Sequence, residues 1–485
     1  MMPALAPTDV PTVAVPDLLY VDVDGTLIRS DLLVESALSL VFRNPLWLFA
    51  LVFWLIKGKA NLKSELVARV RLDPTLLPYR ADFLEWTRAQ QRIGRTVVLA
   101  SASHQTYVQQ IADHLEFDST VLASSDTLNL SGAKKVAAIK AHSHGRGFDY
   151  AGNAAEDLHV WKESAGAILV NAPSGVEYSA RRLTYVVRIF RSHKPGLRIW
   201  AKAVRVHQWV KNLLIAVPLL TAFQFADISS VLRIVAAIIA FSLVASATYL
   251  ANDLADLQAD RKHVRKCKRA FASGDIGILQ GILVGVLLLA TGLTIAAKVS
   301  LPFFGAVIVY LLATLSYSLK LKQFILIDVI CLAGLYTWRI IAGALAINVE
   351  MSNWLAGFSL FVFLSLALVK RCSELVSLEQ QFKEAAHGRD YRVADGAVLA
   401  AMGISSGFVA VLVLALFIDA PTTAMHYSSP RVLWVLCPLM LYWIGRIWVK
   451  TARGEMHDDP IVFSAKDRAS WVILACIMMI TYLGR

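Results

Sequence analysis

Three aspartates at the end of an apolar stretch have the residue type and spacing of a metal site. Asp253, Asp256 and Asp260 are three and four residues apart, so one helix through them would place them on one face. Three carboxylates at a membrane boundary repel one another unless cations neutralise them. Such oxygen ligands suit Mg²⁺, which shares its coordination shell with substrate phosphates. The segment therefore predicts a site for Mg²⁺ and a diphosphate, with a solvated helix end as the alternative.

Basic residues follow the aspartates at once, from Arg261 to Arg269, and can bind the phosphate oxygens that do not face a metal. A second polar cluster occupies the turn between two later apolar stretches, and we expect its Asp328 to complete the metal site. Its predicted phosphate ligands are Lys320, Lys322 and Arg339. Interfacial anchoring of the two lysines is one alternative, and a structural ion pair between Asp328 and Arg339 is another.

An apolar run near the N-terminus, residues 18–23, leads into the sequence Asp-Val-Asp-Gly-Thr. This motif resembles the signature of the haloacid-dehalogenase (HAD) phosphatases. The resemblance implies that Asp22 is a nucleophile that forms an aspartyl-phosphate and that Asp24 is the general acid and base. A regulatory domain without activity is the alternative.

Three further positions carry the HAD resemblance. Ser101 ends an apolar run and matches the phosphate-binding Ser/Thr of that family, while either Lys134 or Lys135 matches its lysine. In the segment 150–157, Asp157 matches the family pattern, but Asn153 stands where the family has a metal-binding Asp. The implied Mg²⁺ ligands are Asp22, Asp24, Asn153 and Asp157. An Asn carbonyl can still bind Mg²⁺, although with one negative charge fewer.

The composition determines which elements must position these residues. The chain has 485 residues, of which 56% are apolar and 17% charged, with a positive mean hydropathy, so we expect several membrane spans. The net charge of +12 fits cytoplasmic loops and anionic lipid, and we expect no nucleic acid partner. The five cysteines are scattered, which predicts neither a disulfide framework nor a zinc site. We expect no cleaved signal peptide.

The C-terminal part predicts nine spans of about 20 residues each. Their limits are 207–224, 231–254, 276–299, 302–320, 324–347, 353–372, 396–418, 430–450 and 467–484. Lys and Arg collect in alternate loops, which places those loops, the N-terminal part and both sites on the cytoplasmic side of a bacterial plasma membrane. We therefore expect a multi-pass membrane protein.

The N-terminal part alternates short apolar runs with helical stretches, which predicts a parallel α/β sheet. The runs are 18–23, 96–100, 120–123 and 167–170. The predicted fold is a Rossmann-like HAD domain with a helical cap, followed by an all-α membrane domain. The expected limits are 1–175 for the HAD domain, 31–95 for its cap, 176–206 for a basic juxtamembrane linker and 207–485 for the membrane domain. The apolar stretch 46–56 is either a buried cap helix or a helix dipping into the membrane surface.

The Asn-Asp-x-x-Asp-x-x-x-Asp run, the span count and the Tyr317–Asp328 element resemble the UbiA superfamily of membrane prenyltransferases. A finer set of motifs resembles its decaprenyl-phosphate phosphoribosyltransferase branch. These motifs are Arg205 with Gln208-Trp209-Val210-Lys211-Asn212, the run from Asp260 to Arg269, Ser273-Gly274, Lys370-Arg371 with Glu374, Gly388-Arg389-Asp390-Tyr391 and the loop 454–460. Two departures are Ala270 in place of a common Pro and a second acidic motif reduced to Asp328. The substrate-binding residues implied by this resemblance are Asn252, Arg205, Gln208, Lys211, Arg261, His263, Lys266, Arg269, Tyr317, Lys320, Lys322, Asp328, Arg339, Lys370, Arg371 and Glu374.

The two resemblances imply two reactions. The membrane domain would transfer 5-phosphoribose from phosphoribosyl diphosphate to a lipid-embedded polyprenyl phosphate, with Mg²⁺ on Asp253, Asp256 and Asp260. The HAD domain would then remove the 5-phosphate, and the product would feed arabinose donors for cell-envelope glycans. An aromatic prenyltransferase and a transporter or lipid-binding scaffold are the competing classes. A late loop with His457, Asp458 and Asp459 is either a solvated turn or a substrate contact, and the oligomeric state is left open.

Overall fold

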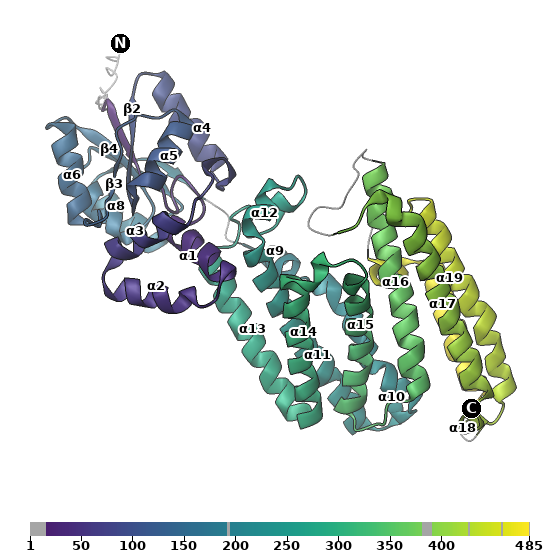
Figure 1. Cartoon of the computed structure of the whole chain (residues 1–485). Helices are drawn as coiled ribbons and strands as arrows, with labels where there is room; N and C mark the ends of the chain where they lie inside the picture. The colour runs from purple at the N-terminus through teal and green to yellow at the C-terminus, as the bar shows by residue number, and fades with distance from the viewer. Residues whose placement is uncertain (1–15, 192–194, 381–389, 425–426, 457–458, 485) are drawn as a thin grey trace, which may run out of the picture. The chain divides into compact units, whose positions relative to one another are not determined.

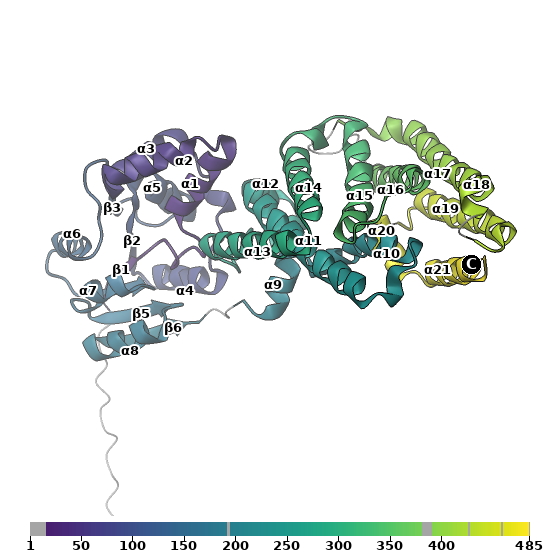
Figure 2. The same ribbon diagram turned by 90° about the horizontal axis from the view of Figure 1, so that it is seen from below.

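The chain divides into two compact units in the computed structural model (Figures 1 and 2). The structure describes residues 16–191, 195–380, 390–424, 427–456 and 459–484. Unit 1 comprises Met1–Ala203 and Asp253–Leu283, and unit 2 comprises Val204–Asn252 and Val284–Arg485. The first unit thus contains a segment that the sequence places inside the membrane domain.

A six-stranded parallel sheet forms the centre of unit 1, in the order β3-β2-β1-β4-β5-β6. The strands are β1 (Leu18–Val21), β2 (Thr96–His104), β3 (Leu122–Ser124), β4 (Phe148–Gly152), β5 (Gly166–Val170) and β6 (Tyr185–Phe190). Because β1 pairs with both β2 and β4, the residues that follow these three strands meet at one edge of the sheet.

Alternate residues of β1 are buried on opposite faces of the sheet, as the two-residue period of a strand requires. Leu19 and Val21 share a core with helices α4 and α5, whereas Leu18 and Tyr20 share a core with α6, α7 and α8. These helices are α4 (Ala81–Arg92), α5 (Gln105–Leu115), α6 (Ala133–Ser143), α7 (Leu158–Trp161) and α8 (Ser174–Leu183). Apolar residues on both faces explain why the strands read as continuous apolar runs.

The predicted parallel α/β sheet is confirmed, but two of its strands were not predicted. Strand β4 contains Asp149, whose carboxylate pairs with Arg95 at 2.7 Å inside the protein. Because of this charged residue, the strand does not read as an apolar run in the sequence. Strand β6 is an edge strand in which Tyr185 is exposed and Arg188 interrupts the apolar residues. The predicted linker 176–206 therefore contains most of α8, all of β6 and α9 (Leu197–Ala203).

Three of the four α-helices between β1 and β2 form a separate layer within the predicted cap (Figure 1). They are α1 (Leu32–Arg43), α2 (Trp47–Ile56) and α3 (Lys59–Arg69). Leu40 of α1 and Leu66 of α3 are buried in the core of the sheet domain. In α2, by contrast, Trp54 is the one buried residue, so the interpretation of this stretch as a buried cap helix is wrong.

The segment 253–283 of unit 1 connects two long helices, α11 (Ile228–Ala255) and α13 (Ile278–Val299). Helix α11 ends one residue before Asp256, and the short helix α12 (Leu257–Lys262) begins one residue after it. The expectation that the three aspartates share one continuous helical face is therefore wrong, because Asp256 occupies the break between two helices.

Unit 2 is a bundle of long apolar helices that run side by side in both views (Figures 1 and 2). Besides α11 and α13 they are α14 (Leu301–Leu319), α15 (Ile327–Ala346), α16 (Asn353–Glu379), α17 (Gly396–Asp419) and α19 (Leu436–Ala452). One core joins α11, α14 and α15, and a second joins α15, α16, α17 and α19. Helix α15 therefore contributes to both cores.

Seven described helices are long and apolar enough to cross a membrane, compared with nine predicted spans. The span predicted at 207–224 is interrupted, because η3 (Val206–Ala216) is a 3₁₀ helix that is followed by the short α10 (Val217–Thr221). The last predicted span corresponds to α21 (Arg468–Gly484), which has 17 residues. The count of nine is therefore not confirmed, and the orientation of the helices remains a prediction.

Candidate active sites

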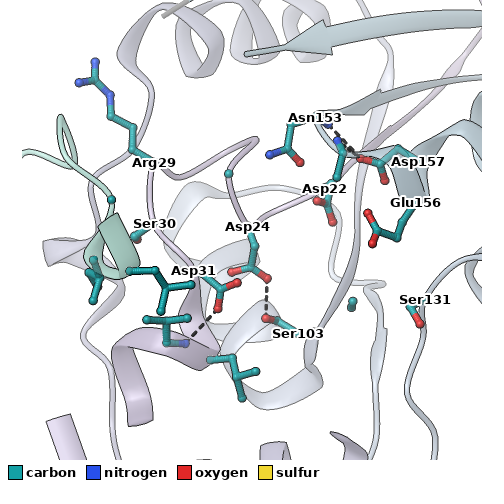
Figure 3. Close-up of a pocket in the computed structure, with 18 of the residues that line it drawn as sticks. Asp22, Asp24, Arg29, Ser30, Asp31, Ser103, Ser131, Asn153, Glu156 and Asp157 are labelled. Atoms are coloured by element: carbon teal, nitrogen blue, oxygen red, sulfur yellow. Dashed lines mark hydrogen bonds between the residues drawn. The ribbon is translucent and has the colours of Figure 1, made fainter. Parts of the chain in front are cut away.

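The edge of the sheet beyond β1, β2 and β4 opens into a cavity of about 600 Å³, here called the Asp22 pocket. Asp22 and Asp24 follow β1, Ser103 comes from β2, and Asn153 and Asp157 follow β4 (Figure 3). The backbone N–H of Asp22 donates to the carbonyl of Ala151 at 3.0 Å, which continues the sheet pairing into the pocket. Ligands of parallel α/β sheets bind at this edge.

Asp22 has the surroundings of a nucleophile. Its carboxylate is nearly buried and lies 3.0 Å from the ammonium of Lys135. Burial raises the pKa of Asp22 to about 6, while Lys135 opposes that shift, so the side chain is an anion at neutral pH. Lys135 thus holds a positive charge where an incoming phosphate would place its negative charge. Lys134, the other candidate, is exposed.

Asp24 has the surroundings of a general acid and base. Its Oδ2 accepts a hydrogen bond from Ser103 Oγ at 2.6 Å, and its Oδ1 accepts one from the backbone N–H of Leu32 at 2.8 Å. Burial, Asp31 and Asp22 together raise the pKa of Asp24 to about 7. A carboxyl group with a pKa near the working pH can both give and take a proton.

Asp157 positions the loop after β4. Its Oδ2 accepts the backbone N–H groups of Asn153 and Ala154 at 2.9 and 3.0 Å, and its Oδ1 accepts the hydroxyl of Tyr150 at 2.7 Å. Asn153 approaches the first loop so closely that a Cβ on Gly25 would lie 2.3 Å from its Nδ2. Asp157 therefore orients this loop, and the roles of Asp157 and Asn153 as metal ligands remain predictions.

Ser101, the predicted phosphate-binding residue, is fully buried, and its hydroxyl lies 3.5 Å from Asp24. Ser103 lines the pocket instead, and the sequence reasoning missed it. The signal was available, because residues two apart on a strand lie on the same face. Lys63 of α3 also lines the pocket and was missed, because only the folded cap brings it to the strand ends.

The donors in the Asp22 pocket suit Mg²⁺, since Asp22, Asp24 and the Asn153 amide offer oxygen atoms. The mutual repulsion of Asp22 and Asp24, which contributes to the raised pKa of Asp24, is the electrostatic situation that a divalent cation relieves. In the part of the chain that the structure describes, no three His, Cys, Asp or Glu side chains form a ready-made metal cluster. A bound metal would thus need phosphate oxygens or water to complete its shell.

The Asp253 segment, residues 253–269, gathers opposite charges around one guanidinium. Arg269 Nη1 lies 2.7 Å from Asp260 Oδ2 and 3.2 Å from Asp253 Oδ1. Two carboxylate oxygens therefore lie close to one positively charged atom. The same two oxygens would suit a divalent cation that carries a diphosphate. Asp256 is partly buried between α11 and α12, and Asn252 precedes the segment.

The basic run of the same segment divides into two groups. His263 and Lys266 are exposed, as phosphate-recruiting residues would be. Arg261 is buried, and its guanidinium donates to both carboxylate oxygens of Glu35 in α1 at 2.9 and 2.7 Å. Arg261 Nε also donates to the carbonyl of Ala272 at 3.2 Å. Three of its five N–H groups are therefore used within unit 1, and phosphate binding by Arg261 remains a prediction.

The buried Glu35–Arg261 pair should stabilise unit 1 strongly. Glu35→Gln leaves a buried guanidinium without its counter-charge, and we expect the free energy of unfolding of unit 1 to fall by about 3–5 kcal/mol. Asp275→Asn is the matched control, because it breaks the half-exposed pair with Arg29 and should cost at most about 1 kcal/mol. Thermal unfolding of the full chain measures both. Equal losses would contradict the assignment, and the double substitution Glu35→Met, Arg261→Met should restore most of the stability.

In unit 2, four side chains form the Asp459 cluster. Asp459 Oδ2 lies 2.7 Å from Lys211 Nζ, 3.5 Å from Lys370 Nζ and 3.3 Å from the hydroxyl of Tyr336. Burial raises the pKa of Asp459, but Lys211 and Lys370 outweigh it and hold this pKa at about 2. Asp459 is thus an anion that lies between two basic side chains.

Two arginines of unit 2 have different partners. Arg339 donates to Asn212 Oδ1, the carbonyl of Leu335 and the hydroxyl of Tyr310, which are all neutral groups. Arg371 instead pairs with Asp328 at 2.6 Å and also with Glu374. The alternative of an Asp328–Arg339 ion pair is therefore wrong, because Asp328 is neutralised by Arg371 and accepts the hydroxyl of Tyr317 at 2.7 Å.

The remaining predicted residues lie at the ends of helices. The guanidinium of Arg205 stacks over the ring of Tyr249 at 4.6 Å, and Gln208 is half-buried two residues into η3. Lys320 is exposed at the end of α14, and Lys322 is half-buried in the following turn. His457 and Asp458 lie outside the described residues. Asp459, their neighbour, is the residue of that loop that the structure places among charged partners.

Apolar helices with buried charges at their ends define a multi-pass membrane protein. The chain matches the UbiA prenyltransferase family over residues 213–480, and it belongs to this family of transferases. It is 37% identical over 462 residues to an uncharacterized protein, y4nM, of Sinorhizobium fredii, which covers 95% of this chain and 89% of that protein. The match therefore includes both the sheet domain and the membrane helices.

Other relatives match smaller shares of the chain. The nodulation protein NoeC of Azorhizobium caulinodans is 33% identical over 58% of this chain and 90% of its own length. The decaprenyl-phosphate phosphoribosyltransferase of Mycobacterium tuberculosis is 33% identical over 36% of this chain and 59% of its own length. A solved UbiA homolog from Archaeoglobus fulgidus, bound to GPP and Mg²⁺, is 17% identical with a TM-score of 0.45, covering 59% of this chain and 98% of its own.

Proposed function

We propose that the membrane domain transfers 5-phosphoribose from phosphoribosyl diphosphate to a polyprenyl phosphate at the cytoplasmic face of a bacterial plasma membrane. In this reaction the bond between ribose C1 and the diphosphate breaks, and an oxygen of the lipid phosphate bonds to C1. The lipid phosphate is already an anion, so no general base is needed. The similarity to decaprenyl-phosphate phosphoribosyltransferases supports this choice of substrates.

The observation that carries the proposal is that, among these described residues of unit 2, the basic side chains outnumber their carboxylate partners, with Lys211 and Arg339 buried and Lys370 partly exposed. Lys211 and Lys370 share one carboxylate, and Arg339 donates to neutral groups. Buried cations without equal counter-charge are costly in a membrane protein, and they persist where they bind an anion. A reaction between two phosphate-bearing substrates needs such charges, whereas an aromatic acceptor does not.

Asp253, Asp256 and Asp260 would hold Mg²⁺ against the diphosphate, which lowers the charge on the leaving group. Arg269, which now neutralises Asp253 and Asp260, would turn to the phosphate oxygens when the metal binds. Asn252, His263 and Lys266 would add polar contacts to the same substrate. The converging oxygens of Asp253 and Asp260 and the exposed side chains of His263 and Lys266 support this proposal.

We further propose that the sheet domain is a HAD-type phosphatase that removes the 5-phosphate of the lipid product. Asp22 attacks the phosphorus, and Asp24 gives its proton to the departing ribose oxygen. Asp24 then takes a proton from the water that hydrolyses the aspartyl-phosphate, which regenerates Asp22. Tethering the two domains keeps the intermediate near the second site. The product is polyprenyl-phosphoryl ribose.

One experiment tests both steps. The full-length protein in vesicles receives labelled phosphoribosyl diphosphate, polyprenyl phosphate and Mg²⁺, and the lipid product is identified by mass spectrometry. We expect polyprenyl-phosphoryl ribose, with one inorganic phosphate released for each diphosphate. A lipid that keeps its 5-phosphate would exclude the phosphatase step. Turnover only with a polyprenyl diphosphate and an aromatic acceptor would replace the transferase proposal by an aromatic prenyltransferase.

The raised pKa values in the Asp22 pocket predict the pH dependence of phosphate release. Asp22 must be an anion to attack, so release should fall as the pH drops below about 6, which is the pKa of this residue. Protons and Mg²⁺ compete for the same carboxylates, so a higher Mg²⁺ concentration should move this acid limb to lower pH. Initial rates of phosphate release between pH 5 and 8 at two Mg²⁺ concentrations test this expectation. A loss of activity at low pH that does not move with the Mg²⁺ concentration would contradict the proposed ligands.

A further inference from the structure

Helix α2 of unit 1 presents an apolar surface to solvent. All ten of its residues are apolar, and the exposed fractions reach 76% for Phe49 and 80% for Ile56. The large apolar side chains of α2 that are more than half exposed are Leu48, Phe49, Val52, Phe53, Leu55 and Ile56. Contiguous apolar surface of this kind is rare on a soluble protein and marks a contact with a partner or a membrane.

The other side of α2 is fastened to the cap. Trp47 and Trp54 pack together, with ring centroids 5.7 Å apart, and Arg69 of α3 stacks over the Trp54 ring at 4.8 Å. The helix is therefore held in place by one face while the opposite face stays apolar and open. A helix that had no defined position on the cap would not have a packed face of this kind.

Cations at both ends of α2 fit a lipid surface. Arg43 lies before the helix, and Lys57 and Lys59 follow it, all three exposed. The ammonium of Lys57 lies 4.4 Å from the centre of the Phe53 ring, so its apolar stem follows the exposed face. Long cationic side chains beside exposed aromatic rings are typical of the zone where lipid headgroups meet acyl chains.

The same unit also contains the start of a membrane span. Leu33 and Val34 of α1 line the Asp22 pocket together with Ile278 and Leu279, the first residues of α13. Helix α1 leads into α2 through residues 44–46, so α2 follows an element that lines one pocket with the first residues of a candidate span. Both contributions to this pocket lie in unit 1.

We infer that α2 lies in the headgroup region of the membrane as a second, non-spanning lipid contact of this chain. Ten residues at 1.5 Å per residue extend about 15 Å, which is half of the hydrocarbon thickness, so α2 cannot cross the bilayer. Its exposed apolar face points into the acyl chains, and Arg43, Lys57 and Lys59 contact anionic headgroups. The contact fixes the mouth of the Asp22 pocket at the membrane surface.

Depth-dependent quenching tests this contact in the full-length protein. Phe49→Cys, in a variant whose five cysteines are replaced by alanine, is labelled with pyrene and placed in vesicles that contain lipids brominated at shallow acyl positions. We expect strong quenching at residue 49. Lys140→Cys is the matched control, because its side chain is also exposed but lies on α6, and it should show little quenching. Equal, weak quenching at both positions would overturn the inference, as would pyrene excimer emission at residue 49, which indicates a second copy of the chain.

A second measurement does not depend on the cysteine-free variant. The wild-type protein is reconstituted with a lipid that carries a photoreactive group near its headgroup, and cross-linked peptides are identified by mass spectrometry. Cross-links to residues 47–56 support the contact, and cross-links confined to the long helices of unit 2 overturn it.

A third arm concerns the substrate and rests on the proposed phosphatase function. Phe49→Asp should lower phosphate release from the lipid-linked product in vesicles several-fold, and it should leave hydrolysis of a water-soluble phosphomonoester unchanged. An equal loss with both substrates would contradict a role of α2 at the membrane. If the wild type hydrolyses neither substrate, the phosphatase proposal fails, and quenching at residue 49 still decides the lipid contact.

Discussion

Asp253→Asn is expected to reduce phosphoribosyl transfer by at least about 10²–10³-fold, the usual cost of losing one preorganised electrostatic contact to a transition state. The carboxylate of Asp253 converges with that of Asp260 on one guanidinium atom of Arg269, at 3.2 and 2.7 Å. The amide removes a negative charge from this pair while keeping its shape. The metal and the diphosphate should therefore bind more weakly, and the loss should grow as Mg²⁺ is lowered.

The measurement is diphosphate release from labelled phosphoribosyl diphosphate in vesicles. Asp227→Asn is the matched control, since Asp227 is an exposed aspartate at the opposite end of α11, where it accepts hydrogen bonds from Ser229 and Ser230. Phosphate release from a supplied phosphomonoester shows that the variant still folds. Wild-type transfer by Asp253→Asn would exclude the Asp253 segment as the metal site.

Asp22→Asn is expected to abolish phosphate release, by a factor on the order of 10³ or more, and to leave transfer intact. The amide cannot form the aspartyl-phosphate. It also leaves the ammonium of Lys135 with Asp157, 3.6 Å away, as its remaining carboxylate partner in this pocket. The lipid product should therefore accumulate with its 5-phosphate still attached.

Mass spectrometry of the lipid product distinguishes the two outcomes. Asp126→Asn is the matched control, because Asp126 is an exposed aspartate beyond β3 that contacts Ser64 and His104 and does not line the pocket. Phosphate release at the wild-type rate from Asp22→Asn would show that this domain is not a phosphatase with an Asp22 nucleophile. A parallel loss of transfer would instead indicate that the two units depend on each other for folding.

Much of the fold could be predicted because buried strands and helices appear in the sequence as runs of apolar residues. Strands β1 and β5 are fully buried and β2 is buried over most of its length, so they read as apolar runs, whereas Leu122 and Ala123 of the edge strand β3 are half-buried. Strand β4 could not be recognised in this way, since Asp149 is tolerated inside it only because Arg95 lies beside it in the folded sheet. The long membrane helices were predicted for the same reason as the apolar runs, because lipid demands continuous apolar stretches.

The interrupted segment at η3 and α10 shows the limit of that reasoning. Its composition is that of a span, but the chain follows a 3₁₀ helix there and buries Lys211 and Asn212. These polar residues find partners on other elements, Lys211 with Asp459 and Asn212 with Arg339 and Ser242. A hydropathy pattern cannot report contacts between residues that are more than 100 positions apart.

The sequence alone predicts the chemistry of each part from residues that are close in the chain: Asp22 and Asp24 after an apolar strand, and Asp253, Asp256 and Asp260 beside a basic run. Their spacing did not predict the break between α11 and α12 at Asp256. The folded structure shows that Lys135, and not Lys134, contacts Asp22, and it brings Ser103 and Lys63 to the Asp22 pocket. It also pairs Arg261 with Glu35, which is 226 residues away in the chain. It also decided that α2 is exposed. Partner choice and exposure depend on what packs against a side chain in space, and local spacing contains no information about that packing.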